Sequence, residues 1–296
     1  MDIIYEQKTE DWALSPRTCN TNNHQSEMSD IEYHELVIRT NKSKWVDKFP
    51  DPEGSLSVTI PLHMCEIMLD VTNIGYIKGK RPKIYEEELE ELERIIEQTI
   101  HGSNINKWFI RLKNASPKDG YYGPGPLLSA KEMVTSLSTS LRAKSSFRSA
   151  VTDGIPDILY IIPWRDDWRE SLEFRVFVYK NHVSAISQYI WHRYLGWNHD
   201  TISIIAPKII TFCNDYIIPK MEIDNYVVDV TIVTSALDPN NGMIPEIKEE
   251  DILVELVEFN SFGAELSSGG ALFHWLDDHD ILYNEKTTTV RYITKM

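Results

Sequence analysis

LVELVEFNSFG, residues 253–263, carries the most information about the fold, and YVVDV at residues 226–230 accompanies it. Both segments have the apolar, β-branched composition of strands, and both carry carboxylate or amide side chains. Because successive strand residues point to opposite faces, Glu258 and Asn260 share one face, whereas Glu255, at an odd offset, is expected to face away. Asp229 sits inside its own apolar strand, where a carboxylate is costly to bury unless a cation meets it.

Asp229, Glu258 and Asn260 form a candidate metal site. Carboxylate and amide oxygens from two neighbouring strands are the hard ligands that Mg²⁺ or Mn²⁺ favours, and nucleotide phosphates often complete such sites. The alternative is that these side chains belong to an edge strand and face solvent. The two segments alone leave both interpretations open.

Two further segments add charged groups that suit an anionic ligand. EFRVFVY (residues 173–179) places Glu173 and Arg175 on one strand face, and a hairpin turn is expected after it. WFIRLKNASPKDG (residues 108–120) is an apolar strand that ends in a turn, with Arg111 and Lys118 nearby. The planar guanidinium of Arg suits phosphate. The glycine-rich motifs GxxxxGK[ST] and GxGxxG do not occur in the sequence.

The ordered motifs SPKD, PW, EFRVFV, ISQY, VVDV, ELVEFNSFG and LFHW resemble those of the cell division cycle protein 123 family, a member of the ATP-grasp superfamily. The similarity extends from Lys44 to Asp280. It implies an α+β, ATP-grasp-like fold of two lobes with antiparallel sheets that hold Mg-ATP between them. For eukaryotic members it also implies a role in assembling translation initiation factor 2, by binding its gamma subunit.

The resemblance further implies which residues hold the nucleotide and metal. The metal ligands would be Asp229, Glu258 and Asn260, and the other nucleotide-binding residues would be Arg111, Ser116, Lys118, Asp119, Trp164, Glu173 and Arg175. Two positions depart from the family pattern. Arg111 stands where a phosphate-binding Lys is expected, and Ile162 precedes Pro163-Trp164 where an Arg is common. These departures indicate a divergent member.

The expected organisation has three parts. Residues 1–34 form a flexible N-terminal arm, because they are rich in Ser, Thr, Asn and Gln with few apolar anchors. Residues 35–160 form the N-terminal lobe, and residues 161–296 form the C-terminal lobe with the metal and nucleotide site. Hydrophobic spacing and capping residues predict helices over 85–100, 129–142 and 201–216.

Composition limits the possible partners. The chain has 296 residues, of which 42% are hydrophobic and 25% charged, as is ordinary for a folded protein. A formal charge of −15 argues against nucleic-acid partners and anionic membranes. No apolar run approaches the roughly 20 residues of a membrane-spanning helix. Three scattered cysteines without CxxC spacing, and an acidic start unlike a signal peptide, favour a reducing, cytoplasmic location.

Two functions follow from this sequence. The first is an ATP- and Mg²⁺-binding assembly factor for a protein partner, the gamma subunit of initiation factor 2 by resemblance. The second is an ATP-grasp enzyme that ligates a carboxylate to an amine, on a peptide or small molecule, through an acyl phosphate. No catalytic residue is assigned, and the GxSxG and HExxH motifs are absent from the sequence. Whether the chain is an enzyme stays open.

Overall fold

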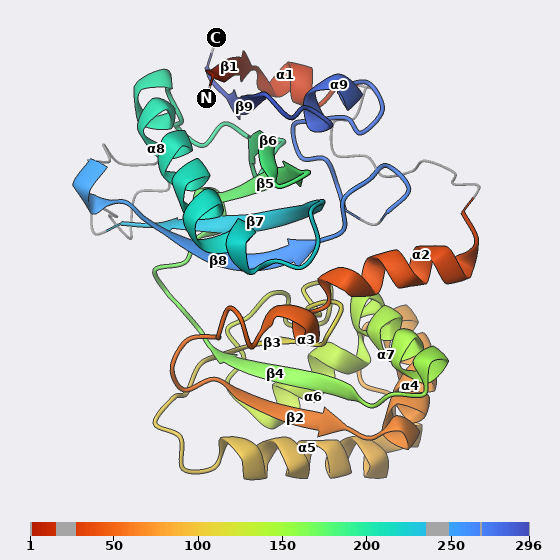
Figure 1. Ribbon diagram of the computed structural model, residues 1–296. Coiled ribbons are helices and arrows are strands. Elements are labelled where there is room, and N and C mark those ends of the chain that lie inside the picture. The colour runs from red at the N-terminus through yellow and green to blue at the C-terminus, as the bar shows by residue number, and fades with distance from the viewer. Residues whose placement is uncertain (1, 16–27, 235–248, 267, 296) are drawn as a thin grey trace. The chain divides into compact units, whose positions relative to one another are not determined.

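The computed structural model describes residues 2–15, 28–234, 249–266 and 268–295 (Figure 1). The chain separates into two compact units. The middle unit comprises residues 41–165, and the terminal unit comprises residues 1–40 and 166–296. Each unit combines a sheet with helices, so the expectation of an α+β fold is confirmed.

The terminal unit is built on a six-stranded sheet with the order β1-β9-β6-β5-β7-β8. Its strands are β1 (Asp2–Lys8), β5 (Glu173–Tyr179), β6 (His182–Gln188), β7 (Tyr226–Val233), β8 (Leu253–Asn260) and β9 (Thr287–Ile293). Neighbours from β6 to β8 are antiparallel, while β9 runs parallel to both β6 and β1. The β5–β6 hairpin turns at Lys180 and Asn181, both with positive φ, as a tight turn between twisted strands requires.

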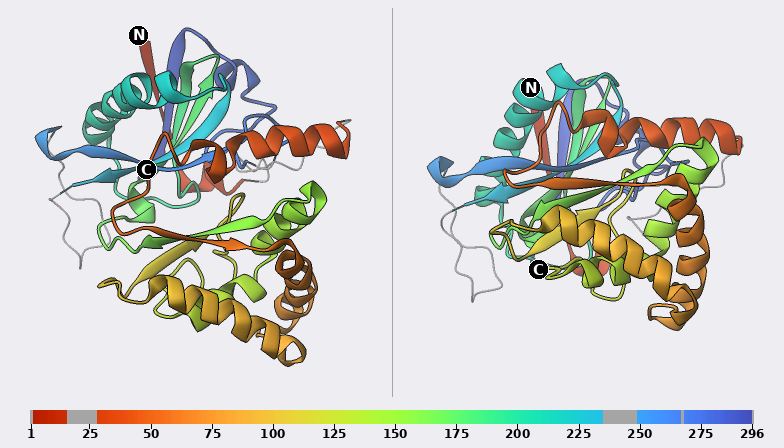
Figure 2. Two further views of the ribbon diagram at one scale, coloured as in Figure 1. Left: turned by 60° about the horizontal axis from the view of Figure 1, so that its bottom comes forward. Right: turned by 90° about the horizontal axis from the view of Figure 1, so that it is seen from below.

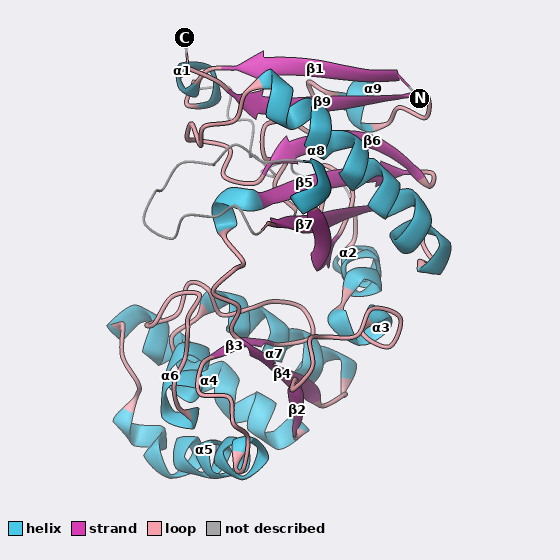
Figure 3. Ribbon diagram, turned by 90° about the vertical axis from the view of Figure 1, so that its left-hand side faces the viewer, coloured by secondary structure: helices cyan, strands magenta, loops and turns pink. Residues whose placement is uncertain are grey.

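Helix α8 (His199–Phe212) covers one face of this sheet (Figure 3). It begins at Asn198, whose side chain accepts a hydrogen bond from the backbone N–H of Thr201. A π-helical turn (Cys213–Ile217) and a 3₁₀ turn (Ile218–Lys220) continue it. Over His199–Lys220 this helical stretch is long and apolar enough to cross a membrane, but a core helix passes the same test of length and composition.

The segment after β8 packs on the opposite face of the sheet. Phe177, Ala185 and Val227 of the sheet contact Phe273, Trp275 and Leu282 of that segment in one buried apolar cluster. The short helix α9 (His279–Leu282) ends the segment before β9. Residues 261–278, described apart from residue 267, are called the cover loop below.

The middle unit is a three-stranded antiparallel sheet with helices packed against it (Figure 2). Its strands are β2 (Leu56–Ile60), β4 (Asp157–Pro163) and β3 (Trp108–Arg111), in that order across the sheet. Its helices are α3 (Lys42–Trp45), α4 (Leu62–Lys78), α5 (Glu86–Ile100), α6 (Ala130–Ser138) and α7 (Leu141–Asp153). Leu89, Leu92 and Ile96 are buried on α5, as the predicted apolar stripe requires.

The predicted helix over 129–142 is in fact two helices. Ser129 caps α6 as expected, by accepting a hydrogen bond from the backbone N–H of Glu132. The helix ends at Ser138, and Ser140 starts α7 as a second N-cap by accepting from the N–H of Ala143. Local capping by a serine side chain therefore wins over continued helical periodicity.

The N-terminal arm is the main departure from the expected organisation. Residues 2–8 pair with β9 over the whole length of β1, and α1 (Glu10–Ala13) and α2 (Asp30–Val37) follow. The polar composition that suggested an arm is concentrated in residues 16–27, which lie outside the described residues. The first 40 residues thus belong with the C-terminal part of the chain, because β1 joins the edge of its sheet.

Candidate functional site

A row of directly paired polar residues crosses the whole sheet of the terminal unit. In spatial order the row consists of Glu6, Arg291, Ser187, Arg175, Asp229 and Glu258, one from each strand. Paired residues of neighbouring strands point to the same face, so these six side chains lie on one face of the sheet. This is the face that carries Phe177 and the apolar contacts of the cover loop.

At the centre of the row, Arg175 and Asp229 form a buried bidentate ion pair. The Nε and Nη2 atoms of Arg175 donate to Oδ1 and Oδ2 of Asp229 at 2.9 and 2.8 Å. Asn260 Nδ2 donates to the same Oδ2 at 2.9 Å, and Arg175 Nη1 donates to the carbonyl oxygen of Gly269 at 2.6 Å. Burial lowers the pKa of Arg175, but the Asp229 charge and hydrogen bonds outweigh burial and raise it, so Arg175 stays cationic.

The three predicted metal ligands come together beside this pair. Glu258 is directly opposite Asp229, only 7% of its surface is exposed, and Asn260 follows two residues later on the same face. The donor set of two carboxylates and an amide suits a hard divalent cation. The formal charges of Arg175, Asp229 and Glu258 sum to −1, which also favours a cation. Among the described residues, no three His, Cys, Asp or Glu side chains group as a metal site, and the proposed set consists of two carboxylates and one amide.

A β-bulge overturns the prediction for Glu255. Asp229 pairs with Glu258 but Val230 pairs with Leu256, so Val257 is an extra residue on β8. The extra residue shifts the alternation by one. Glu255 therefore pairs with Thr231 on the same face as Glu258, and its Oε2 accepts a hydrogen bond from Trp168 Nε1 at 2.8 Å.

Glu173 lies one row away from the ion pair. It pairs with Thr231 from the side of β5, which places Glu173 and Glu255 on either side of that residue. On β5, β7 and β8, four carboxylates thus share this sheet face with Arg175. The strand periodicity had placed Glu173 and Arg175 together correctly, whereas the position of Glu255 depends on the bulge.

The other predicted nucleotide-binding residues belong to the middle unit. Arg111 ends β3, is 4% exposed, and its guanidinium carbon lies 5.7 Å from the ring centroid of Trp45. Ser116 is buried, and its carbonyl oxygen accepts a hydrogen bond from Arg142 Nε. Lys118 is partly exposed in the turn that follows, and Trp164 directly follows β4.

Asp119 has a structural role in this unit. Its Oδ1 accepts a hydrogen bond from Ser140 Oγ at 2.5 Å, and its Oδ2 accepts from the backbone N–H of Leu141 at 2.9 Å and, at 3.4 Å, of Arg142. A carboxylate at a helix N-terminus satisfies N–H groups that have no partner within the helix. Asp119 thus fixes the SPKD turn to the start of α7, and a nucleotide contact by this residue stays a prediction.

The sequence had not singled out Lys42. It is 1% exposed, its Nζ lies 2.5 Å from Asp51 Oδ1, and the rings of Trp45 and Tyr160 lie 4.4 and 5.1 Å away. Burial, and the charge of Asp51 after it, raise the pKa of Tyr160 to about 12, while Arg111 opposes the rise. A buried lysine is suggested by KSKWVDKFPD, where lysines lie near aromatic residues, but this pattern does not show which lysine is buried.

Comparison with known proteins defines the class. The sequence model of the D123 family matches residues 127–296, more than half of the chain, and this protein belongs to that family. The solved structure of Cdc123 from Schizosaccharomyces pombe is similar, with a TM-score of 0.60 and 18% identity over 87% of this chain and 97% of that one. The solved structure of its C-terminally truncated form is also similar, with a TM-score of 0.60 and 17% identity over 92% of this chain and 100% of that one. At these identities the likeness shows a shared fold. No curated protein matches the sequence.

Proposed function

We propose that this protein binds Mg-ATP, with Asp229, Glu258 and Asn260 as ligands of the metal ion. The observation that carries the proposal is their juxtaposition on β7 and β8, on one buried sheet face, beside the charged group of Arg175. Arg175 would hold the Asp229 carboxylate in a fixed orientation, because both oxygens are fastened by one rigid guanidinium. A site that is already organised loses little free energy to ordering when its ligand arrives.

Electrostatics support a cation that arrives together with a polyphosphate. The formal charge of Arg175, Asp229 and Glu258 is −1, so free nucleotide would be repelled, whereas Mg²⁺ would reverse the sign of the local charge. When bound, Mg²⁺ supplies charge neutralisation at the phosphates. Arg111 and Lys118 remain the predicted phosphate contacts of the middle unit, together with the turn at Ser116 and Asp119. Trp164 and Glu173 remain predicted nucleotide neighbours.

Membership of the D123 family supports a second part of the proposal, a protein partner. We propose the gamma subunit of translation initiation factor 2, met in the cytoplasm, with this protein acting as an assembly factor. Purified gamma subunit, passed over immobilised protein with and without Mg-ATP, tests this directly. Retention of the subunit in an equimolar complex supports the role. If the subunit were not retained under either condition, the assembly role would be contradicted. Phosphate release in the presence of amine and carboxylate substrates would instead support a ligase.

Calorimetric titration of Mg-ATP tests the nucleotide site. Glu258→Gln keeps the shape of the side chain and removes one anionic ligand, so the dissociation constant is expected to rise about tenfold, equivalent to about 1.4 kcal/mol. Glu255→Gln is the matched control, because it is the same substitution on the same strand and face. The Glu255 carboxylate accepts a hydrogen bond from Trp168, so the dissociation constant of the Glu255→Gln variant is expected to change by less than twofold. Wild-type affinity in a folded Glu258→Gln variant would remove Glu258 from the site.

A further inference from the structure

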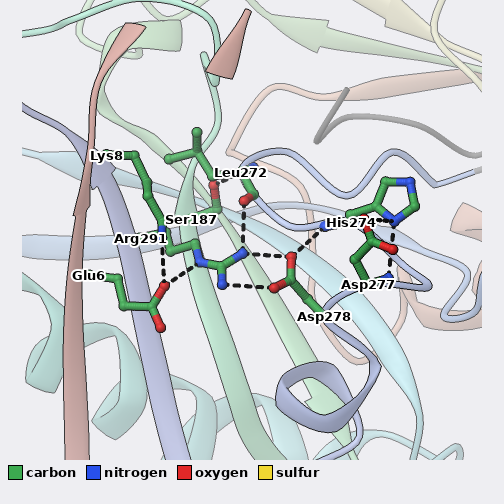
Figure 4. A network of polar contacts seen from close by, with 8 residues as sticks. All are labelled: Glu6, Lys8, Ser187, Leu272, His274, Asp277, Asp278 and Arg291. Carbon is green, nitrogen blue, oxygen red and sulfur yellow. Dashed lines mark hydrogen bonds and ion pairs between the residues drawn. The ribbon is translucent and has the colours of Figure 1, made fainter. Parts of the chain in front are cut away.

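Two arginines of the polar row hold the cover loop in place. Arg175 Nη1 donates a hydrogen bond to the carbonyl oxygen of Gly269, and Arg291 Nη1 donates to that of Leu272 at 3.2 Å. Between them, Ser187 Oγ accepts from the backbone N–H of Leu272 at 3.0 Å. Three neighbouring strands thus hold one stretch of loop backbone, and Figure 4 shows the part around Arg291.

Arg291 is itself fixed by carboxylates from two different directions (Figure 4). Its Nη1 and Nη2 atoms contact Asp278 at 2.6 and 2.8 Å, and its Nε contacts Glu6 Oε2 at 2.7 Å. It is 4% exposed, and its guanidinium carbon lies 4.3 Å from the ring centroid of Phe273. Burial lowers the pKa of Arg291, but the hydrogen bonds and charges of Asp278 and Glu6 outweigh burial and raise it.

The cover loop connects these contacts to the candidate metal site through the chain itself. It starts at Ser261, directly after the proposed ligand Asn260, and Ser268 Oγ donates a hydrogen bond back to the carbonyl oxygen of Ser261. Trp275 Nε1 donates to the carbonyl oxygen of Ser268 at 2.8 Å. A displacement at the Arg291 end would therefore move Gly269, whose carbonyl oxygen is one of the groups that orient Arg175.

We propose that Arg291, held by Glu6 of the N-terminal strand, is a positioning residue for the Arg175–Asp229 pair and acts through the cover loop. The N-terminal strand then contributes to ligand binding from the far edge of the sheet, although it provides no ligand itself. Burial raises the pKa of Glu6, but the hydrogen bonds and charges of Arg291 and Lys8 outweigh burial and lower the pKa below its ordinary value. The carboxylate is therefore charged at neutral pH and available for this role. The inference deepens the proposed function, and its ligand-binding part rests on Mg-ATP binding.

Glu6→Gln tests the inference in the full-length chain. The substitution keeps the shape of the side chain and weakens its hold on Arg291. We expect faster amide hydrogen exchange in peptides covering 268–278, and a rise in the Mg-ATP dissociation constant of about fivefold, the low end of ordinary coupling between sites. Asp2→Asn, on the same strand and exposed, is the control and should change neither. If the melting temperature fell while exchange in the loop and affinity for Mg-ATP stayed at wild-type values, the inference would be overturned.

Arg291→Lys provides a second, independent variant. It keeps the positive charge but loses the fork that contacts Glu6, Asp278 and Leu272 together, so both effects should exceed those of Glu6→Gln. Loop exchange also separates the two proposals. If the wild type bound no Mg-ATP, the proposed function would fail, but faster exchange of the Gly269 region in both variants would still support positioning. Unchanged exchange in both variants would refute positioning whatever the nucleotide result.

Discussion

The Asp229 carboxylate is fully buried, and both of its oxygens accept hydrogen bonds from Arg175. A buried pair of this kind is costly to break from one side, because the remaining charge stays in a medium of low polarity. Asp229 therefore combines a structural role with a proposed role in binding. It neutralises Arg175 in the ligand-free protein, and it is proposed to contact the metal when nucleotide binds.

Asp229→Asn tests the structural role alone. The amide keeps the shape but leaves the Arg175 charge uncompensated, so the free energy of unfolding in urea should fall by about 3–5 kcal/mol. Asp224→Asn, the same substitution at an exposed position just before β7, should change it by less than about 0.5 kcal/mol. A loss below about 1 kcal/mol for Asp229→Asn would mean that the pair is not buried as described.

The sequence predicted which polar side chains lie together on β7 and β8, but not the direction of every side chain. Asp229, Glu258 and Asn260 stood out because polar oxygens inside apolar strands are costly, and the structure brings them together on β7 and β8. The predicted direction of the Glu255 side chain was wrong, because a β-bulge adds one residue to β8. Strand alternation in the sequence does not reveal such a bulge. The cap formed by Asp119 could not be predicted, because Asp119 lies 21 or more positions from the residues at the start of α7 that it contacts.

Among the elements, the N-terminal strand differs most from expectation. Alternation in DIIYEQK is too short to stand out beside a polar stretch, and its partner β9 lies at the other end of the chain. Parallel pairing between chain ends has no local turn signal that a sequence could display. Helix α5, by contrast, was predicted from its own apolar stripe, because helical periodicity is a local property.

Removal of residues 1–8 should destabilise the protein measurably. The deletion exposes β9 as a sheet edge and removes Glu6 from Arg291, and we expect a loss of about 2 kcal/mol, or about 4–8 °C in melting temperature. Calorimetry or circular dichroism measures the shift. A chain that lacks only Met1 and Asp2 serves as the control and should melt within about 1 °C of the wild type. An unchanged melting temperature for the longer deletion would restore the interpretation of this segment as a loose arm.

For the whole molecule, the family match and the shared fold agree with the expectations drawn from ordered motifs. At 18% identity to the Schizosaccharomyces pombe structure, the fold is retained while most side chains differ. The two units with their separate sheets match the two lobes that the family resemblance implied. The sequence does not show that the chain begins in the terminal unit, leaves it after residue 40 and returns at residue 166, because the pairing of β1 with β9 joins residues that are far apart in the chain.

We propose that Asp229, Glu258 and Asn260 hold a divalent metal ion together with ATP. Crystals soaked with ATP and Mn²⁺, and measured for the anomalous scattering of manganese, test it most directly. We expect an anomalous peak about 2.1 Å from oxygens of all three side chains and beside the ATP phosphates. ATP bound with manganese held by other residues, or bound without metal while these side chains keep their present contacts, would contradict it.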